Sequence, residues 1–236
     1  MNKNAIYFTA AIGFLLSGCG GGGGSGAPTA PAVTPAPPVT VAPVTPVPQV
    51  IVVQLNAAVS ALYSLPHDFN NTVKSPAGDT YNARVVYSNI VDTNIESLAV
   101  KSVDIKRTIL KNDAPLQSSS ETSFFQLNPY RLVSSKSMDN PLYIVASNQV
   151  ALPTTAKPGD SGAYYDSTTF DSTGKNLILS TAKHTWSLSS ESATTVLFCD
   201  NSVISIAQIS GTTTRADCYQ IDTNSNVVSN RLVIPQ

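Results

Sequence analysis

The stretch that decides the fold class is Tyr81-Asn82-Ala83-Arg84-Val85-Val86-Tyr87-Ser88. Its odd-numbered positions are apolar, whereas Asn82, Arg84 and Ser88 are polar. A repeat of two residues is typical of a β-strand that has one face buried and the other in water. The same alternation returns at 103–109, where Val103, Ile105 and Ile109 alternate with polar side chains. A mainly β chain is therefore expected.

Further strands are predicted as far as the C-terminus. They cover residues 81–88, 103–109, 123–127, 131–135, 142–150, 162–170, 177–188, 194–209, 217–221 and 227–234. Turn-forming Asn, Asp, Gly and Pro separate them at 111–113, 139–141, 157–160, 172–174 and 222–226. Short connections and half-polar strands favour an antiparallel meander. About ten strands predict a curved sheet or partly open barrel, and a two-sheet β-sandwich is the alternative.

One amphipathic helix is expected before the sheet, which places the fold on the border of α+β. Val52, Leu55, Val59 and Leu62 recur at helical spacing and predict a helix over about 51–64. Its start is ambiguous, because the β-branched run 50–53 suits a strand equally well. Pro66 ends the helix, and residues 68–71 are predicted to form a loop. The helix is expected to bury its apolar stripe against the concave side of the sheet.

A short apolar segment at the N-terminus ends in Leu16-Ser17-Gly18-Cys19. Lys3 precedes about a dozen largely apolar residues, fewer than the roughly 20 that a membrane-spanning helix needs, so the segment is typical of a cleaved leader. The run 16–19 resembles the lipobox of bacterial lipoproteins. That resemblance implies that 1–18 is a signal peptide and that Cys19 becomes the acylated first residue, while Gly20 after it implies sorting to the outer membrane. An ordinary secretory signal is the alternative.

Residues 19–48 are predicted to be a disordered tether. Glycines fill 20–24, and eight of the 16 prolines lie between 28 and 48, a composition that excludes a helix and favours polyproline II. The first fifty residues resemble Gram-negative lipoproteins that carry a glycine run and a proline tract. The remaining 49–236 is one domain's worth of sequence, and it resembles the mainly β domains of other envelope lipoproteins.

Two cysteines remain once Cys19 is lipidated, and they are expected to form a disulfide. Export places the domain in an oxidising compartment, where two lone cysteines in one domain usually pair. Cys199 and Cys218 lie in neighbouring predicted strands that a turn at 210–212 can connect. Asp200 and Asp217 flank them with negative charge, which disfavours the alternative of a reactive thiol pair.

Charge and composition narrow the range of partners. The formal net charge is −1, or −2 after Lys3 leaves with the leader, so the chain offers no basic field for nucleic acid. It has no basic amphipathic helix either, and membrane attachment is expected to depend on Cys19 alone. No cofactor is predicted.

One motif resembles a catalytic sequence, but its residues do not follow the order of the family that it resembles. Gly159-Asp160-Ser161-Gly162 resembles the nucleophile motif of chymotrypsin-like serine proteases, and Thr181-Ala182-Lys183-His184 loosely resembles their histidine segment. In that family the histidine precedes the serine, whereas His184 follows Ser161, and His67 has no matching context. The motif is therefore interpreted as a turn. No catalytic residue is named, and serine hydrolase stays a remote alternative.

Metal binding is not expected either. The two histidines are not clustered with cysteines at ligand spacing. His67 and Asp68 suit a loop. His184 and Trp186 share a strand face with Ile178 and Leu188, which indicates packing, with a ligand-binding aromatic as the alternative.

Two classes of function remain open. One is an outer-membrane lipoprotein with a structural or protein-interaction role, facing the periplasm or the cell surface. The other is a binding module that holds an apolar or amphiphilic ligand between the helix and the curved sheet. A cavity-free core favours the first class, and an unfilled concave face favours the second.

Overall fold

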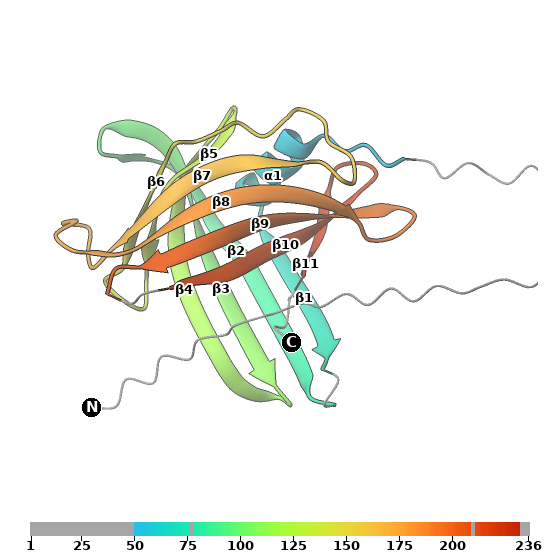
Figure 1. Cartoon of the computed structure of the whole chain (residues 1–236), viewed down its shortest axis with the longest axis horizontal. Helices are drawn as coiled ribbons and strands as arrows, with labels where there is room; N and C mark the ends of the chain where they lie inside the picture. Colours follow the sequence, from blue (N-terminus) through green and yellow to red (C-terminus); the bar gives the residue numbers. More distant parts are fainter. Residues whose placement is uncertain (1–49, 76–77, 209–210, 232–236) are drawn as a thin grey trace, which may run out of the picture. The chain divides into compact units, whose positions relative to one another are not determined.

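The computed structural model describes residues 50–75, 78–208 and 211–231. Within these ranges, eleven antiparallel strands form one sheet in sequence order, accompanied by one helix, α1 (Leu55–Ser64) (Figure 1). The strands are β1 (His67–Lys74), β2 (Thr80–Ile95), β3 (Leu98–Lys111), β4 (Ala114–Leu127), β5 (Tyr130–Ser137), β6 (Tyr143–Ser147), β7 (Ser161–Phe170), β8 (Ile178–Ser190), β9 (Thr195–Ile206), β10 (Thr212–Asp222) and β11 (Val227–Arg231). The predicted leader, Cys19 and tether lie outside the described residues, as do 232–234 of the last predicted strand.

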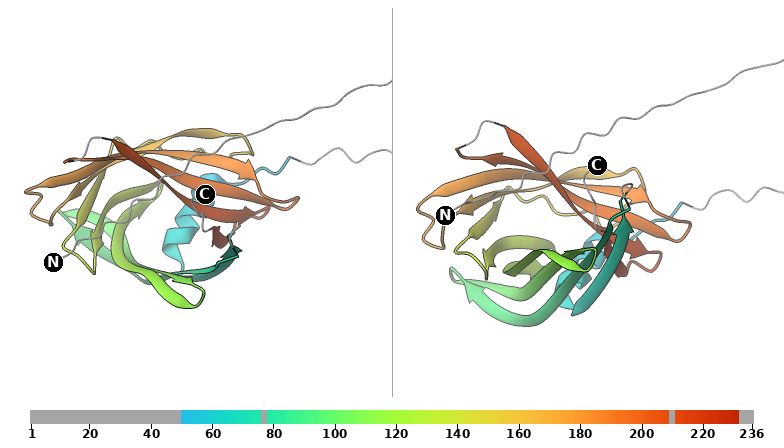
Figure 2. Two further views of the ribbon diagram at one scale, coloured as in Figure 1. Left: turned by 60° about the horizontal axis from the view of Figure 1, so that its bottom comes forward. Right: turned by 90° about the horizontal axis from the view of Figure 1, so that it is seen from below.

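The sheet curves until its two edge strands come close together, so that it forms a nearly closed barrel (Figure 2). Asn71 Nδ2 on β1 donates a hydrogen bond to the backbone oxygen of Asn230 on β11 at 2.9 Å. The curved antiparallel meander predicted from the sequence is confirmed. The sandwich alternative is wrong, because the described strands make up one continuous sheet.

Helix α1 packs inside the curve of the sheet (Figure 2). Leu55, Ala58, Val59 and Leu62 are buried on its inner face and belong to the same hydrophobic core as the inward side chains of the strands. Ser60 Oγ also donates to the backbone oxygen of Leu127 at 3.1 Å. Across the residues that the structure describes, no helix combines the length and the apolar character needed to cross a bilayer.

The helix starts later than predicted, because the ambiguous segment before it is extended. Ile51 and Val53 are buried whereas Val52 is exposed, which is the alternation of a strand. Val53 and Ala156 exchange backbone hydrogen bonds of 2.9 and 3.0 Å in an isolated bridge. The expectation that Val52 belongs to the apolar stripe of the helix was therefore wrong.

Residues 68–71, predicted as a loop that also contains His67, belong to strand β1. Phe69 is buried and pairs with Val85 on β2, while exposed Asp68 forms an ion pair with Arg84. Cross-strand pairing and the burial of one aromatic ring outweigh the turn preference of Asp and Asn in this segment.

Several strands are longer than predicted. β4 begins at Ala114 rather than at 123, and β10 begins at Thr212 rather than at 217. The added parts are largely polar and exposed, so they carry no apolar alternation. β6, in contrast, is shorter than predicted and ends at Ser147.

The predicted turns are found where strands join. Asn112 and Asp113 connect β3 to β4 with positive φ angles of 49° and 64°. In the turn before β7, Gly159 has a φ of 96°, a conformation that favours glycine, and Asp160 Oδ2 accepts a hydrogen bond from the Lys157 amide at 2.9 Å.

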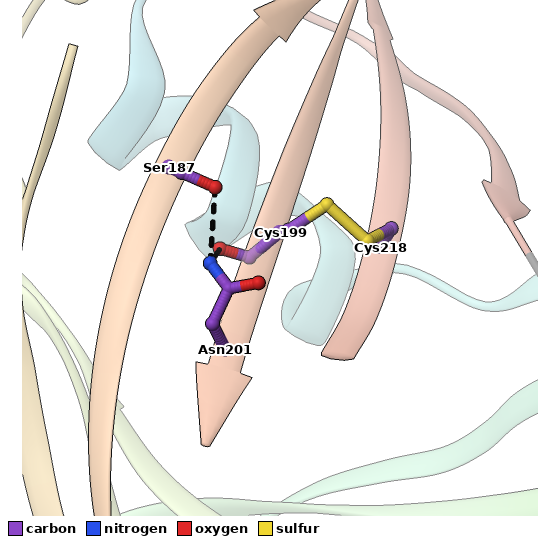
Figure 3. The surroundings of a disulfide bond; sticks show 4 residues. All are labelled: Ser187, Cys199, Asn201 and Cys218. Carbon is purple, nitrogen blue, oxygen red and sulfur yellow. Dashed lines mark hydrogen bonds between the residues drawn. A yellow bond between two sulfur atoms is a disulfide. The ribbon is translucent and has the colours of Figure 1, made fainter. Parts of the chain in front are cut away.

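The predicted disulfide joins Cys199 on β9 to Cys218 on β10 (Figure 3). The two residues stand directly opposite each other in the strand register, with their Cα atoms 4.1 Å apart. Their side chains occupy the face of the sheet opposite to that of Phe198 and Tyr219. The covalent link therefore fixes the β9–β10 register without entering the barrel.

Candidate functional site

The lumen of the barrel has two halves with different chemistry, because inward-facing positions change from apolar to polar along several strands. On β3, for example, Val103 and Ile105 are followed by Arg107. The apolar half contains the buried side of α1 and the strand residues around it. Its members are Val59, Leu62, Val103, Ile105, Phe125, Leu188, Val196, Phe198 and Ile221. The polar half consists of Arg107, Glu121, Ser167, His184, Asp200, Arg215 and Asp217. These polar residues come from six strands: β3, β4, β7, β8, β9 and β10.

A cavity of about 180 Å³ lies between the two halves and is lined by all seven residues of the polar half. It exceeds the roughly 10–15 Å³ that one water needs, and it is smaller than the roughly 300–1,000 Å³ typical of drug-sized ligands. The side chains of Arg215 and Asp217 are 55% and 39% exposed, so the cavity reaches solvent on their side. Its size suits a small molecule.

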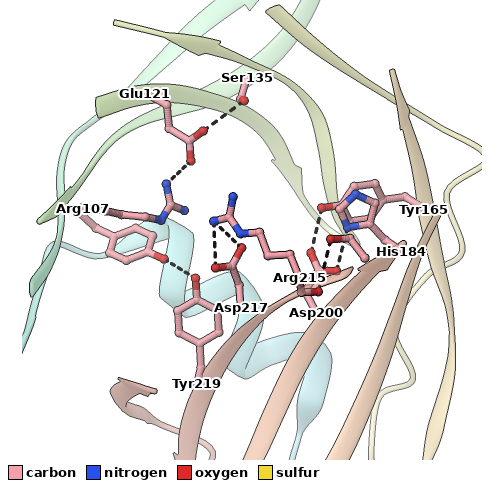
Figure 4. Close-up of polar contacts among 11 residues, drawn as sticks. Arg107, Glu121, Ser135, Tyr165, His184, Asp200, Arg215, Asp217 and Tyr219 are labelled. Atoms are coloured by element: carbon pink, nitrogen blue, oxygen red, sulfur yellow. Dashed lines mark hydrogen bonds and ion pairs between the residues drawn. The ribbon is translucent and has the colours of Figure 1, made fainter. Parts of the chain in front are cut away.

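Two arginines point toward one another in this cavity (Figure 4). Arg107 Nη1 pairs with Glu121 Oε1 at 2.6 Å, and Arg215 Nη2 lies 2.9 Å from Asp217 Oδ2. Burial alone would lower the pKa of Arg107, but the carboxylates of Glu121 and Asp217 outweigh it and hold this pKa well above its usual range. The guanidinium therefore keeps its charge inside the barrel.

Asp217 is influenced by both arginines. Burial alone would raise its pKa, but the positive charges of Arg215 and then Arg107 outweigh this and lower it. Asp217 is therefore ionised at neutral pH. The polar half as a whole sets two guanidinium groups against three carboxyl groups, those of Glu121, Asp200 and Asp217.

His184 connects a serine to a carboxylate across the neighbouring strands β7, β8 and β9. Figure 4 shows its contact with the carboxylate, which is that of Asp200. Its Nδ1 lies 2.8 Å from Asp200 Oδ1 on β9, and its Nε2 lies 3.1 Å from Ser167 Oγ on β7. An ionised carboxylate only accepts hydrogen bonds, so Nδ1 carries the proton in the neutral ring. Nε2 is then the acceptor, and the Ser167 hydroxyl donates to it.

Tyr165 holds this histidine from a second side. Its ring stacks on the imidazole with centroids 4.0 Å apart, and its hydroxyl donates to Asp200 Oδ2 at 2.9 Å. Burial, reinforced by the charge of Asp200, raises the pKa of Tyr165 well above its usual range. The phenol therefore stays a donor at neutral pH.

A β-bulge in β7 lies directly opposite His184. Ala163 pairs with Thr185 and Asp166 pairs with Lys183, so β7 has one extra residue over this interval. As a result, Tyr164 and Tyr165 both line the cavity, although neighbours on a regular strand face opposite ways.

Six tyrosines form a band along the boundary between the two halves. This tyrosine band comprises the buried Tyr87, Tyr130, Tyr164 and Tyr219 and the partly buried Tyr63 and Tyr165. Tyr63 stacks on Tyr130 with ring centroids 4.8 Å apart, and the hydroxyls of Tyr87 and Tyr219 are 2.8 Å apart. Burial is the main cause that raises the pKa of all six phenols.

The protease-like motif serves the fold. Ser161 is the exposed first residue of β7, and the hydroxyl bound by His184 is that of Ser167. Gly162 lies against an indole ring: an added Cβ there would come within 2.9 Å of Trp186 Nε1. The other histidine, His67, stacks on Phe69 in β1.

His184 and Trp186 lie on one face of β8, and this face points into the lumen. Trp186 and Leu188 are buried in the core, whereas Ile178 is 48% exposed near the far end of β8. His184 itself contributes a polar contact rather than apolar packing.

Among the polar-half residues, only His184 was considered from the sequence as a possible binding residue, and Asp200 and Asp217 were noted only for their charge beside the cysteines. A signal was present, because Arg107 continues the alternating positions of Val103 and Ile105, and Asp200 continues those of Phe198. Charged residues in phase with a buried face indicate a polar lumen. In the part of the chain that the structure describes, no three His, Cys, Asp or Glu side chains gather in a way that would hold a metal ion.

Comparisons with known proteins give no family. The sequence matches no protein-family model, and neither the curated proteins nor the solved structures provide a significant match. The functional argument therefore depends on the geometry of the lumen.

Proposed function

We propose that this protein is an outer-membrane lipoprotein, anchored through acylated Cys19, whose barrel binds a small zwitterionic molecule in the polar half of its lumen. The observation that carries the proposal is the pair of arginines, Arg107 and Arg215, that point toward one another in a cavity open to solvent. The location is supported by the lipobox-like run 16–19 alone. The ligand is argued from the charges of the lumen.

An acid group fits between the two guanidinium groups. Among the described residues, Arg107 and Arg215 each have one ion-pair partner, yet a guanidinium carries five N–H donors. Bringing two like charges together is unfavourable unless negative charge lies between them. A ligand carboxylate or phosphate would add that charge and accept paired hydrogen bonds from the planar donors.

The ligand also needs a positively charged group. The polar half contains three carboxyl groups and two guanidinium groups, so a purely anionic ligand would meet more acidic than guanidinium side chains. An ammonium group placed near Asp200 or Glu121 would balance the third carboxyl group. A small zwitterion supplies both groups within the available volume.

This proposal changes the ligand that the sequence suggested. The alternative drawn from the sequence was an apolar or amphiphilic ligand between helix and sheet, but Val59 and Leu62 of α1 occupy that part of the lumen and are buried against the strands. The unfilled space is the polar half. A cavity supports the binding class over a purely structural role.

Native mass spectrometry tests the proposal directly. Full-length protein extracted from the envelope and freed of detergent is expected to retain a small bound molecule. Arg107→Gln and Arg215→Gln should lose it, whereas Arg84→Gln should keep it. Arg84 is the matched control, because it also pairs with a carboxylate, Asp68, but lies outside the lumen.

Titration with defined compounds tests the charge argument. A series of α- and ω-amino acids should raise the melting temperature, and alkyl carboxylates or alkylamines of the same length should do so less. Loss of charge-assisted hydrogen bonds in Arg107→Gln should weaken binding about tenfold or more. Absence of any bound molecule, together with equal responses of Arg107→Gln and Arg84→Gln, would favour a structural or protein-interaction role.

A further inference from the structure

Ser167, His184 and Asp200 have the arrangement of an activated nucleophile. The hydroxyl lies 3.1 Å from Nε2, and the carboxylate lies 2.8 Å from Nδ1, so the nitrogen that faces the serine is free to accept its proton. Nucleophile, base and orienting group within hydrogen-bond reach are what acyl-transfer catalysis requires. Such a triad is recognised by geometry, and its order along the chain differs between unrelated folds.

The surroundings hold the histidine in one orientation. Asp200 fixes one edge of the ring, and Tyr165 covers one face and also binds the second oxygen of Asp200. The β7 bulge that places Tyr165 there lies directly opposite His184. β-bulges often occur beside active sites, where they redirect a side chain. A histidine that only packed in the core would need neither the bulge nor a carboxylate that a tyrosine holds in place.

The serine also faces the cavity and not packed core. Ser167 and His184 both line the 180 Å³ space, and Arg215 lines the same space from β10. A carbonyl group that enters the cavity would therefore meet the hydroxyl on one side and positive charge on another. Preorganised positive charge stabilises the oxyanion that forms during attack on a carbonyl.

We propose that Ser167 is a catalytic nucleophile that hydrolyses esters of short-chain carboxylic acids, with His184 as general base and Asp200 as its positioning residue. The cavity volume limits the acyl group to a few carbon atoms. This activity goes beyond ligand binding, and it does not depend on the zwitterion proposed above.

The reaction is a two-step hydrolysis. Ser167 Oγ forms a bond to the ester carbonyl carbon while its proton passes to His184 Nε2, and the bond to the leaving alcohol then breaks as the alcohol takes that proton. Water next attacks the acylated serine and gives a proton to Nε2. The carboxylic acid leaves, and Ser167 regains its proton.

A fluorophosphonate with small alkyl groups tests this proposal on the folded, full-length protein. Labelling is expected to map to Ser167 by peptide mass spectrometry and to disappear when the protein is unfolded by heat before labelling. His184→Gln should lower the labelling rate about a hundredfold or more, because it removes the base. Asp200→Asn should also lower the labelling rate, because it favours the histidine tautomer that cannot accept the serine proton, while Ser167 stays in place.

Two matched controls come from the same chain. Ser161→Ala removes the exposed serine at the start of the same strand, and His67→Gln removes the other histidine; both should label at the wild-type rate. Circular dichroism and an intact Cys199–Cys218 bond establish that each variant is folded.

Hydrolysis of short acyl esters should follow the labelling pattern across these variants. Absence of labelling at Ser167, or a labelling rate that His184→Gln leaves unchanged in folded protein, would overturn the proposal and leave the triad as a structural network. Arg84→Gln and Arg107→Gln report on zwitterion binding separately, so that either proposal can fail without the other.

Discussion

The apolar and polar halves of the lumen are built on the same strands yet differ in what their side chains contribute. In the apolar half, Leu62 and Phe125 are fully buried and belong to the hydrophobic core. In the polar half, Arg215 and Asp217 on β10 remain about half and two fifths exposed beside a cavity. One barrel therefore places its apolar packing around α1 and its charged groups beside the cavity.

This division has an energetic basis. Burial of apolar area contributes roughly 25 cal/mol per Å², whereas a partly exposed ion pair contributes about 0–1 kcal/mol. The ion pairs of the polar half are thus expected to contribute less to stability than the buried side chains of the apolar half. Mutations in the apolar half should therefore lower stability more than mutations in the polar half.

The largest expected effect is on stability and lies in the apolar half. Leu62 is 1% exposed between α1 and the strands, so Leu62→Ala should lower the free energy of unfolding by about 2–5 kcal/mol through lost burial and a residual cavity. Val52→Ala is the control, because Val52 is 53% exposed, and it should change stability by less than about 0.5 kcal/mol. Urea unfolding measures the free energy of unfolding of both variants. Equal losses in the two variants would contradict the role given to α1.

The apolar half could largely be predicted from the sequence. The alternation at 81–88 and 103–109 identifies which side chains face inward, and the spacing of Leu55, Val59 and Leu62 identifies the buried side of α1. The error at Val52 arose because a β-branched run satisfies a helix turn and a strand equally well. A backbone bridge to Ala156, about a hundred residues away, decides between them.

The polar half could be predicted only in part. Alternation indicates that His184 and Asp200 face inward, but it says nothing about the register of β7 against β8, which a bulge shifts. Ser167 reaches His184 only because of that register. Long-range pairing of this kind has no local signal, and the same holds for the polar, exposed beginning of β4.

At the boundary between the halves, ionisation of the tyrosine band is expected to have an effect on stability of intermediate size. Burial raises the pKa of its six phenols above the unfolded value of about 10. Their contribution to stability is therefore fully present below pH 10 and is lost as the pH rises through the raised values. We expect alkaline unfolding to coincide with their ionisation.

Ultraviolet difference spectroscopy of the phenolate measures this effect. Tyr7 lies in the predicted leader, so eight of the nine tyrosines are expected in the mature protein. The six in the band should ionise only together with the loss of the folded circular dichroism signal. Protein unfolded in urea is the control, and all eight should titrate near pH 10 there. Ionisation of all eight near pH 10 in a protein that stays folded would contradict the burial of the band.

The smallest expected effect concerns Asp217 in the polar half. The charges of Arg215 and Arg107 lower its folded pKa below the unfolded value of about 3.9, against the opposing effect of burial. The stabilisation is present above pH 4 and is lost as the pH falls through the folded pKa. Because the side chain is 39% exposed, solvent screens the pair, and Asp217→Asn should cost at most about 1 kcal/mol at pH 7.

The acid dependence of this difference identifies its cause. Between pH 7 and pH 3 the stability gap between Asp217→Asn and the wild-type protein should shrink, because protonation makes the wild-type side chain neutral as well. Urea unfolding at both pH values measures the gap. A gap that stays constant or widens toward acid would mean that Asp217 acts by packing or by neutral hydrogen bonds. The polar half would then resemble the apolar half in stabilising the fold, and the division between them would no longer hold.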